Sequence, residues 1–220
     1  MSSASRNPIR VLLVDDHHFF RSGLRSILAE FDAVTVVGEA ESGEAALPLI
    51  ERRKPDVVIM DLNMPGISGA EAGRRVQQLS PGTEVVMLTV SGAEEDVIDA
   101  LEGGAAGYLL KDAGPEELLR AVTAAAHGGS VLSPAVARTV VERARRMAPG
   151  STARRAVSDL SKREREVLRL LADGKNNAEI AGELFIGVAT VKHDVSTLFA
   201  KLGATNRVQA AIKAVRSGLL

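Results

Sequence analysis

The sequence contains no cysteine and no tryptophan, and aromatic residues make up only 3% of its 220 residues. The absence of cysteine excludes disulfide bonds and thiolate chemistry, and it agrees with a reducing compartment. With so few aromatic side chains, the cores must consist of Leu, Val, Ile and Ala, which the 45% hydrophobic content supplies. Long apolar runs are absent too, because the polar start is followed by only four apolar residues, Val11 to Val14, which predicts neither a signal peptide nor a membrane span. We therefore expect a soluble, cytoplasmic protein.

Charge is divided unevenly along the chain, although the net charge is only −1. Residues 1–128 contain 11 Lys and Arg against 20 Asp and Glu, whereas residues 129–220 contain 16 against 8. Acidic groups can hold a cation and a basic segment suits a polyanion such as nucleic acid, although solvated surface alone also produces such an asymmetry. The length favours two domains. We expect one domain over residues 1–128, a linker with a short helix over 129–158, and a second domain over 159–220.

Residues 10–127 alternate between short apolar runs and segments with helical spacing. The apolar runs are Arg10–Val14, Val34–Val37, Val57–Met60, Glu84–Leu88 and Gly107–Leu110. Helices are expected around 20–28 and over 43–51, 70–79, 94–101 and 115–127. Five β-α units of this kind predict an α/β fold with a doubly wound, five-stranded parallel sheet. The flavodoxin-like strand order 2-1-3-4-5 would make the first and third strands neighbours.

Polar residues stand at the carboxyl ends of these predicted strands. Asp15 and Asp16 follow the first strand, Asp61 the third, Thr89 the fourth and Lys111 the fifth. Carboxylates this close repel one another unless a cation compensates, and oxygen ligands suit Mg²⁺. Lys111 and the Thr89 hydroxyl would offer a positive charge and a donor to an incoming anion. The pattern indicates a phosphoryl site with Asp61 as nucleophile, whereas a lone aspartate after a strand is more often a turn residue.

Four motifs carry a resemblance to a known family: Val11–His17, Asp61–Gly66, Met87–Thr89 and Ala105–Lys111. Through them, residues 1–128 resemble the receiver domain of bacterial two-component response regulators. The resemblance implies that Asp61 is the phosphoacceptor and that a sensor histidine kinase is the donor. It also implies that Asp16 and Asp61 ligate Mg²⁺ together with the backbone carbonyl of Asn63, and that Asp15 assists through water.

The same resemblance implies a switch pair, Thr89 and Tyr108. In the family the hydroxyl moves onto the phosphoryl group and the aromatic ring turns inward. These movements shift the balance between two conformations of the surface formed by the last helices and strand. Judged without the resemblance, Tyr108 could equally be a half-buried aromatic at a strand edge with a solvated hydroxyl. His17 and His18 are adjacent on a nascent helix, and adjacent residues do not face the same way, which argues against a metal site formed by this pair.

The composition changes after residue 128. Ser133-Pro134 predicts the start of a short basic helix to Arg146, and residues 148–152 predict a flexible joint. The capping box Ser161–Glu164 opens a helix, and further helices are expected over 177–184, 188–201 and 207–217. Within 188–201 the apolar stripe consists of Val188, Val191, Val195, Leu198 and Leu202, and the outward positions are Ala189, His193, Ser196 and Ala200. Such an outward face fits a major groove, although a small helical bundle with a solvated face shows the same pattern.

Residues 160–214 resemble the LuxR-type helix-turn-helix domain of NarL/FixJ-type response regulators. The motifs are Arg163–Leu168, Asn177–Ala181, Ala189–Lys192 and Lys201–Gly203. The resemblance implies base-edge or groove contacts for Lys192, His193 and Ser196, and phosphate contacts for Thr190 and Lys201. Two residues depart from the family pattern: Gly187 stands where a serine is usual, and Asp194 where a histidine is usual. The resemblance implies that the helix over 207–217 is a dimer contact on DNA, whereas its pattern alone also fits packing within its own domain.

Together these patterns predict a DNA-binding transcriptional regulator that is switched by phosphorylation of Asp61 and binds promoter DNA as a homodimer. The resemblance also allows a contact with RNA polymerase. It predicts no metabolic enzyme, although self-dephosphorylation is compatible with it. One alternative is a phosphohydrolase of the haloacid dehalogenase kind, but such enzymes use a second aspartate where Asn63 stands. Another keeps the DNA binding but not the phosphorylation, with the receiver serving as a dimerisation module that a ligand or partner operates.

Overall fold

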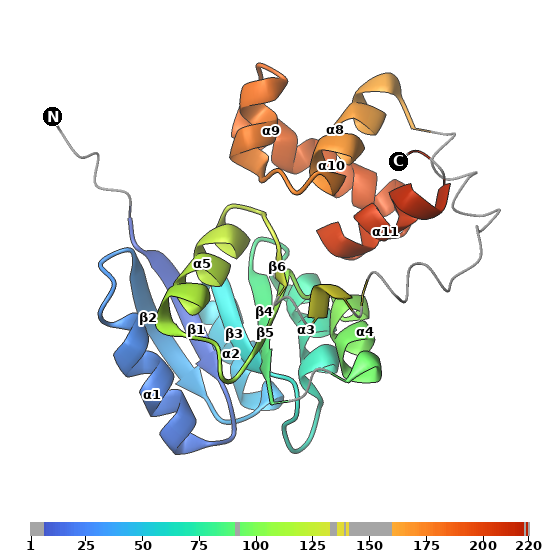
Figure 1. Cartoon of the computed structure of the whole chain (residues 1–220). Helices are drawn as coiled ribbons and strands as arrows, with labels where there is room; N and C mark the ends of the chain where they lie inside the picture. Colours follow the sequence, from blue (N-terminus) through green and yellow to red (C-terminus); the bar gives the residue numbers. More distant parts are fainter. Residues whose placement is uncertain are drawn as a thin grey trace, which may run out of the picture.

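The computed structural model in Figure 1 describes residues 7–90, 93–132, 136–138, 140, 160–217 and 219. A parallel sheet with the order β2-β1-β3-β4-β5-β6 forms the centre of the N-terminal domain. Its strands are β1 (Ile9–Val14), β2 (Val34–Ala40), β3 (Val57–Asp61), β4 (Glu84–Thr89), β5 (Gly107–Leu110) and β6 (Val131–Leu132). The predicted order of the first five strands is confirmed. The prediction of only five strands was wrong, because two residues such as β6 show no periodicity.

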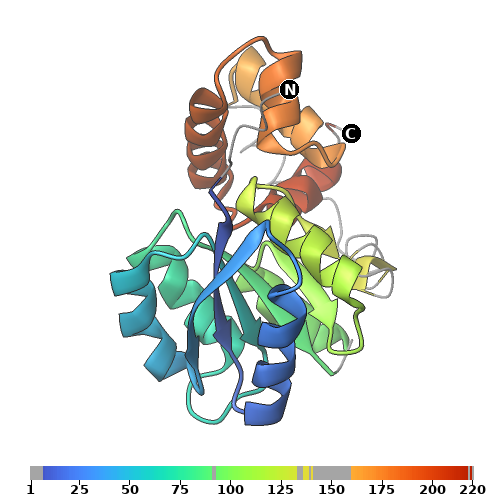
Figure 2. The same cartoon turned by 90° about the vertical axis from the view of Figure 1, so that its left-hand side faces the viewer.

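Helices cover both faces of the sheet. One face carries α1 (His18–Leu28) and α5 (Pro115–Ala126), and the other carries α2 (Gly43–Arg53), α3 (Gly69–Leu79) and α4 (Glu94–Glu102) (Figures 1 and 2). Successive strand residues alternate between the two resulting cores: Leu12 and Val58 pack with α2 to α4, whereas Val11 and Val57 pack with α1 and α5. Burial on both faces is the reason why the strands are continuously apolar.

The predicted bounds agree with the structure to within a few residues, and the largest difference lies in β2. This strand runs to Ala40, three residues beyond the predicted end at Val37. Gly38 and Glu39 are unusual strand residues, but both pair with β1 after a register shift between Val11 and Leu12. Pairing with a central strand has outweighed local propensity.

Four helices form the C-terminal domain. They are α8 (Lys162–Ala172), α9 (Asn177–Glu183), α10 (Val188–Leu202) and α11 (Arg207–Ser217). The predicted capping box is present, since Ser161 Oγ accepts from the Glu164 N–H while Glu164 accepts from the Ser161 N–H. The prediction that Val188 faces the core was wrong, because 42% of its surface is exposed at the first turn of α10. Of the predicted helix over 133–146, residues 136–138 and 140 are described and helical, and the predicted joint over 148–152 lies outside the described residues.

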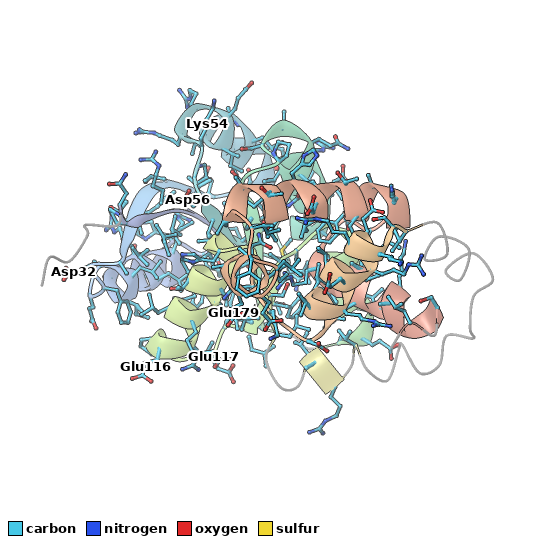
Figure 3. The ribbon with its side chains drawn as sticks, turned by 90° about the horizontal axis from the view of Figure 1, so that it is seen from above. Asp32, Lys54, Asp56, Glu116, Glu117 and Glu179 are labelled. Carbon is cyan, nitrogen blue, oxygen red and sulfur yellow. The ribbon has the colours of Figure 1, made fainter. Side chains whose placement is uncertain are left out.

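The C-terminal helices lie beside the edge of the sheet at which the strands begin (Figures 1 and 2). Figure 3 looks down on this edge, with Asp56 just before β3 and Glu179 on α9 labelled. The carboxyl ends of the strands, where the acidic residues lie, form the opposite edge. Within the described ranges, every helix is too short or too polar to cross a membrane.

Candidate phosphoryl and DNA-binding sites

Three carboxylates meet at the carboxyl edge of the sheet. Asp15 and Asp16 follow β1, and Asp61 is the last residue of β3, which pairs directly with β1. Asp15 and Asp61 are buried, with 2% and 4% of their surface exposed. Together with His17, the three aspartates offer ligand atoms that all lie within 4.8 Å of one another. The parallel pairing of β1 with β3 therefore brings these residues together as the strand order predicts.

Lys111 lies against this acidic cluster. Its Nζ is 2.7 Å from Asp15 Oδ2 and 2.7 Å from Asp61 Oδ2. The same ammonium lies 4.6 Å from the centroid of the Phe20 ring, within the range of a cation–π interaction. Burial disfavours the charged form, but the hydrogen bonds to Asp15 and Asp61 outweigh it and raise the pKa of Lys111. Lys111 therefore stays charged and neutralises part of the cluster.

Contacts that the sequence did not indicate fix the loop after β3. The Asn63 N–H donates to Asp61 Oδ1 at 3.2 Å, and the Gly69 N–H donates to the Leu62 carbonyl at 2.9 Å. A Cβ at Gly69 would lie 2.3 Å from the Asp61 carbonyl oxygen. Only glycine lets α3 begin this close to Asp61. The sequence shows that a glycine stands at the start of this helix, but it does not show which backbone segment the glycine packs against.

Arg21 on α1 is a second supporting residue that the sequence analysis missed. It is buried, and its guanidinium donates to the Asp15 carbonyl and to Glu39 Oε2. These bonds tie the loop after β1 to β2. The helical pattern around Arg21 marks its apolar neighbours as core residues but says nothing about Arg21 itself. Its partners, Asp15 and Glu39, lie on other elements and cannot be inferred from that pattern.

Thr89 and Tyr108 lie on the neighbouring strands β4 and β5, offset by two positions because Tyr108 pairs with Met87, and both are completely buried. Their side chains share a hydrogen bond. Burial and the nearby charge of Asp96 raise the pKa of Tyr108 to about 12 in spite of that bond, so the phenol is neutral. Its ring packs in the hydrophobic cluster that contains Val97 and Leu101 of α4. Tyr108 is therefore not a half-exposed aromatic with a solvated hydroxyl.

The acidic cluster is chemically suited to a divalent cation. Three carboxylates lie together here, two of them buried, and Lys111 is the cation that contacts Asp15 and Asp61. Like charges this close are costly unless further positive charge accompanies them. Carboxylate and carbonyl oxygens, which Asp16, Asp61 and the Asn63 backbone supply, are the ligands that Mg²⁺ prefers.

The helix α10 presents the residues for which DNA contacts were predicted. The exposed ones are Thr190, Lys192, His193 and Ser196. The Ser196 hydroxyl donates to the Lys192 carbonyl at 2.9 Å within the helix. Lys201 is only partly available, because its Nζ lies 2.8 Å from Glu164 Oε1. The face formed by the first four residues is thus open, whereas Lys201 also ties α10 to α8.

The two departures from the family pattern have structural consequences. Gly187 is the N-cap residue of α10 and provides no side-chain cap bond. Asp194 Oδ2 lies 2.9 Å from Arg163 Nε, so the unusual negative charge on α10 is paired with a cation of α8. The repulsion that Asp194 would exert on phosphates is therefore reduced.

Side chains of the C-terminal domain bind the end of α4 in the N-terminal domain. The Leu101 carbonyl accepts hydrogen bonds from Asn206 Nδ2 and from Gln209 Nε2, the latter at 3.0 Å. Val208 and Ile212 of α11 pack into the cluster that contains Leu101. We call this set of contacts the α4–α11 contact. It makes the core of the N-terminal domain continuous with α11.

A second part of the domain interface contains buried charge. Arg207 has 7% of its surface exposed, and its Nε and Nη2 have no hydrogen-bond partner among the described residues. Desolvation lowers the pKa of Arg207 to about 10. Desolvation also raises the pKa of Glu84, at the start of β4, to about 7, although the charges of Lys192 and Arg207 act in the opposite direction. Lys192 of α10 therefore lies within electrostatic reach of the N-terminal domain.

A doubly wound sheet with an acidic cluster, a lysine and a threonine at its carboxyl edge defines a phosphoryl-receiving signalling domain. The four helices that follow, with an exposed polar face on α10, define a helix-turn-helix domain. The class of protein is thus a signal-receiving regulator that binds DNA.

Comparisons with known proteins specify the family. Residues 11–123 match the model of the response regulator receiver domain, and residues 158–214 match that of the bacterial regulatory proteins of the luxR family. The nitrate/nitrite response regulator protein NarL of Escherichia coli K12 is 42% identical over 209 residues, which cover 95% of this chain and 96% of NarL. The probable transcriptional regulatory protein NarL of Mycobacterium tuberculosis H37Rv is 38% identical over the full length of both chains.

Solved structures agree with this result. The response regulator ChrA of a heme-sensing two-component system is 39% identical, covers 98% of this chain and all of its own, and has a TM-score of 0.54. An RcsB–DNA complex is 26% identical over 96% of this chain and 99% of RcsB, with a TM-score of 0.57. The chain belongs to the two-component response regulators that join a receiver domain to a LuxR-type DNA-binding domain. This family consists of transcriptional regulators, and the two domains together imply a histidine kinase and promoter DNA as partners.

Proposed function

We propose that Asp61 is the phosphoacceptor of this response regulator and that its phosphorylation releases the C-terminal domain to bind promoter DNA as a homodimer. The observation that supports Asp61 most directly is the Lys111 ammonium, 2.7 Å from Asp61 Oδ2, beside a cluster of ligand atoms within 4.8 Å of one another. The phosphohistidine of the kinase and the promoter DNA are both located in the cytoplasm, so we propose that the protein is cytoplasmic.

The residues of the cluster have distinct roles in this reaction. The Asp61 carboxylate attacks the phosphorus of the kinase's phosphohistidine, the P–N bond breaks, and the nitrogen leaves with the bonding pair. The leaving group is a neutral imidazole, because the other ring nitrogen carries a proton taken from water. Lys111 neutralises the negative charge that develops on the phosphoryl oxygens. Asp16, Asp61 and the Asn63 carbonyl would hold Mg²⁺, with Asp15 acting through water, and the bound ion supplies further positive charge to the same oxygens.

Thr89 connects the phosphoryl group to the rest of the domain. Its hydroxyl bonds to Tyr108 in the present structure, and a phosphoryl oxygen on Asp61 would be a stronger, charged acceptor for it. Loss of that bond frees Tyr108 within the cluster that it shares with α4. The signal must then cross the sheet along β4, whose six residues span roughly 20 Å.

Phosphorylation would shift the α4–α11 contact between a docked and an undocked state. In the docked state, Asn206 and Gln209 hold the Leu101 carbonyl, and Lys192 of α10 is near Glu84. In the undocked state, α11 is free to form a dimer contact, and the exposed face of α10 can be placed beside that of a second copy on adjacent half-sites. Once two recognition helices are presented on adjacent half-sites, a contact with RNA polymerase becomes sterically accessible.

The test is intact mass spectrometry of the wild-type and Asp61→Asn proteins after incubation with acetyl phosphate and Mg²⁺, with gel filtration of the same samples. We expect one phosphoryl adduct and a shift toward a dimer for the wild type only. Asp56→Asn, the same chemical change at the other end of β3, is the matched control and should be modified normally. An unmodified wild-type protein, under conditions that modify another receiver, would refute the assignment of Asp61.

The two alternatives make different predictions for the same samples. A receiver that only dimerises would bind DNA with an affinity that acetyl phosphate does not change. A phosphohydrolase would turn over small phosphate esters repeatedly. The phosphohydrolase is disfavoured because Asn63 has no acidic proton to donate at the position of the second catalytic carboxyl. The unphosphorylated module is disfavoured because Asp61, Lys111 and the acidic cluster lie together.

A further inference from the structure

We propose that His17 is a direct ligand of the receiver's divalent cation, so that this site binds metals that accept an imidazole nitrogen, such as Co²⁺, Ni²⁺ and Zn²⁺, more strongly than an all-oxygen receiver site does. This inference rests on the proposed phosphoryl site, because it assigns an additional ligand to the same cation.

The position of the His17 ring favours this role. His17 is the N-cap residue of α1, but its side chain makes no cap hydrogen bond. Instead Nδ1 lies 2.7 Å from Asp16 Oδ1 and 3.4 Å from Asp15 Oδ1. Asp16 Oδ1 accepts no hydrogen bond from any other of the described residues, so the His17 ring is its close polar neighbour. A divalent cation bound between these two atoms would replace their mutual contact by two metal–ligand bonds.

The distances are close to those of a single coordination sphere, and a small movement of the ligands would complete it. Two ligands at about 2.1 Å from a metal are about 3 Å apart when adjacent and about 4.2 Å apart when opposite each other. The ligand atoms of Asp15, Asp16, His17 and Asp61 all lie within 4.8 Å of one another. The His17 side chain is 68% exposed, so it can adjust toward a bound ion without disturbing the core.

The chemical consequence is a change in metal preference. Carboxylate, carbonyl and water ligands suit Mg²⁺, whereas imidazole suits first-row transition metals. A ligand from His17 therefore adds affinity for Co²⁺, Ni²⁺ and Zn²⁺ but little for Mg²⁺. It also occupies one position of the coordination sphere that would otherwise hold water.

His18 provides a matched control, since it is the next residue, is also exposed and lies outside the cluster of ligand atoms. Isothermal titration calorimetry at pH 7.5 would compare the binding of Co²⁺ and of Mg²⁺ to the wild type, His17→Ala and His18→Ala. We expect His17→Ala to weaken Co²⁺ binding at least tenfold and Mg²⁺ binding less than twofold, and His18→Ala to change neither. Unchanged Co²⁺ binding in His17→Ala, or an equal loss for both metals, would overturn the proposal.

Pulsed EPR of the Co²⁺- or Mn²⁺-loaded wild-type protein gives a second measurement that does not depend on the folding of a variant. Nitrogen coupling from a directly bound imidazole is expected in the wild type and in His18→Ala. Its absence from the wild type would overturn the proposal. Phosphorylation of Asp61 with acetyl phosphate and Mg²⁺ is expected in all three proteins, so that failure of the His17 assignment and failure of the phosphoacceptor assignment give different results.

Discussion

Replacing Glu84 by glutamine should remove a pH dependence from the stability of the docked protein. Glu84 is partly buried at the start of β4, where desolvation raises its pKa from the ordinary value of 4.5 to about 7. The difference corresponds to about 3 kcal/mol of preference for the neutral carboxyl in the folded protein. Lys192 and Arg207 reduce this preference but do not reverse it.

The sign follows from the protons that each state binds. Between pH 4.5 and about 7 the folded protein keeps a proton on Glu84 that the unfolded chain has lost, so stability falls as the pH rises. The contribution is fully present below pH 4.5 and is lost as the pH passes through about 7. From pH 5 to pH 8 the expected loss is about 2.5 kcal/mol. Because glutamine is neutral throughout, Glu84→Gln should match the wild type at pH 5 and exceed it by about this amount at pH 8.

Urea unfolding followed by circular dichroism, repeated from pH 5 to pH 8, measures this difference directly. Glu30→Gln, which changes an exposed glutamate on the same domain, is the control and should follow the wild-type curve. If the free energies of unfolding of Glu84→Gln and the wild type ran parallel over the whole pH range, burial of Glu84 at the interface would not be the cause of any pH dependence.

Three further substitutions test other parts of the structure. Lys111→Met removes the ammonium and should slow phosphorylation by acetyl phosphate about 100-fold, measured by intact mass over time; an unchanged rate would exclude its role. The double variant Asn206→Ala/Gln209→Ala loses two hydrogen bonds of about 1 kcal/mol each. It should raise the DNA affinity of the unphosphorylated protein by about tenfold or more, measured by fluorescence anisotropy. Unaltered affinity would argue against the α4–α11 contact as the cause of weak DNA binding. Gly128→Ala should separate the domains, seen as an expansion in small-angle scattering, because its Cβ would lie 2.0 Å from Asn177 Nδ2 at the start of α9. Gly174→Ala is the control: it imposes similar backbone strain, but its Cβ meets nothing within 4 Å, so the domains should stay docked.

The sequence alone was sufficient for the order of the first five strands and for the three aspartates and the lysine at the carboxyl edge. Short apolar runs that end in acidic residues reveal parallel strands, and parallel strands necessarily bring their carboxyl ends to one edge. Asp15, Asp61 and Lys111 could therefore be placed together before any coordinates were known. The helices of the C-terminal domain followed from caps and from helical periodicity, which are local signals.

Residues that act through distant contacts could not be found in this way. Gly69 matters because of the Asp61 carbonyl, Arg21 because of the Asp15 carbonyl, and Asn206 because of Leu101, which is 105 residues away. The sequence around these residues does not indicate their partners, because tertiary packing and not the neighbouring residues in the chain determines which groups they contact. The same reason explains why Val188 was misplaced, since an apolar residue at the first turn of a helix can lie beyond the edge of the core.

Local sequence thus determined which elements form and which chemistry collects at the carboxyl edge of the sheet. Only the tertiary structure decided that the DNA-binding domain docks at the opposite edge, through α11 on α4, and that His17 turns toward the aspartates. Periodicity and capping depend on residues a few positions apart, whereas docking depends on the shape, charge and desolvation of surfaces that exist only after each domain has folded.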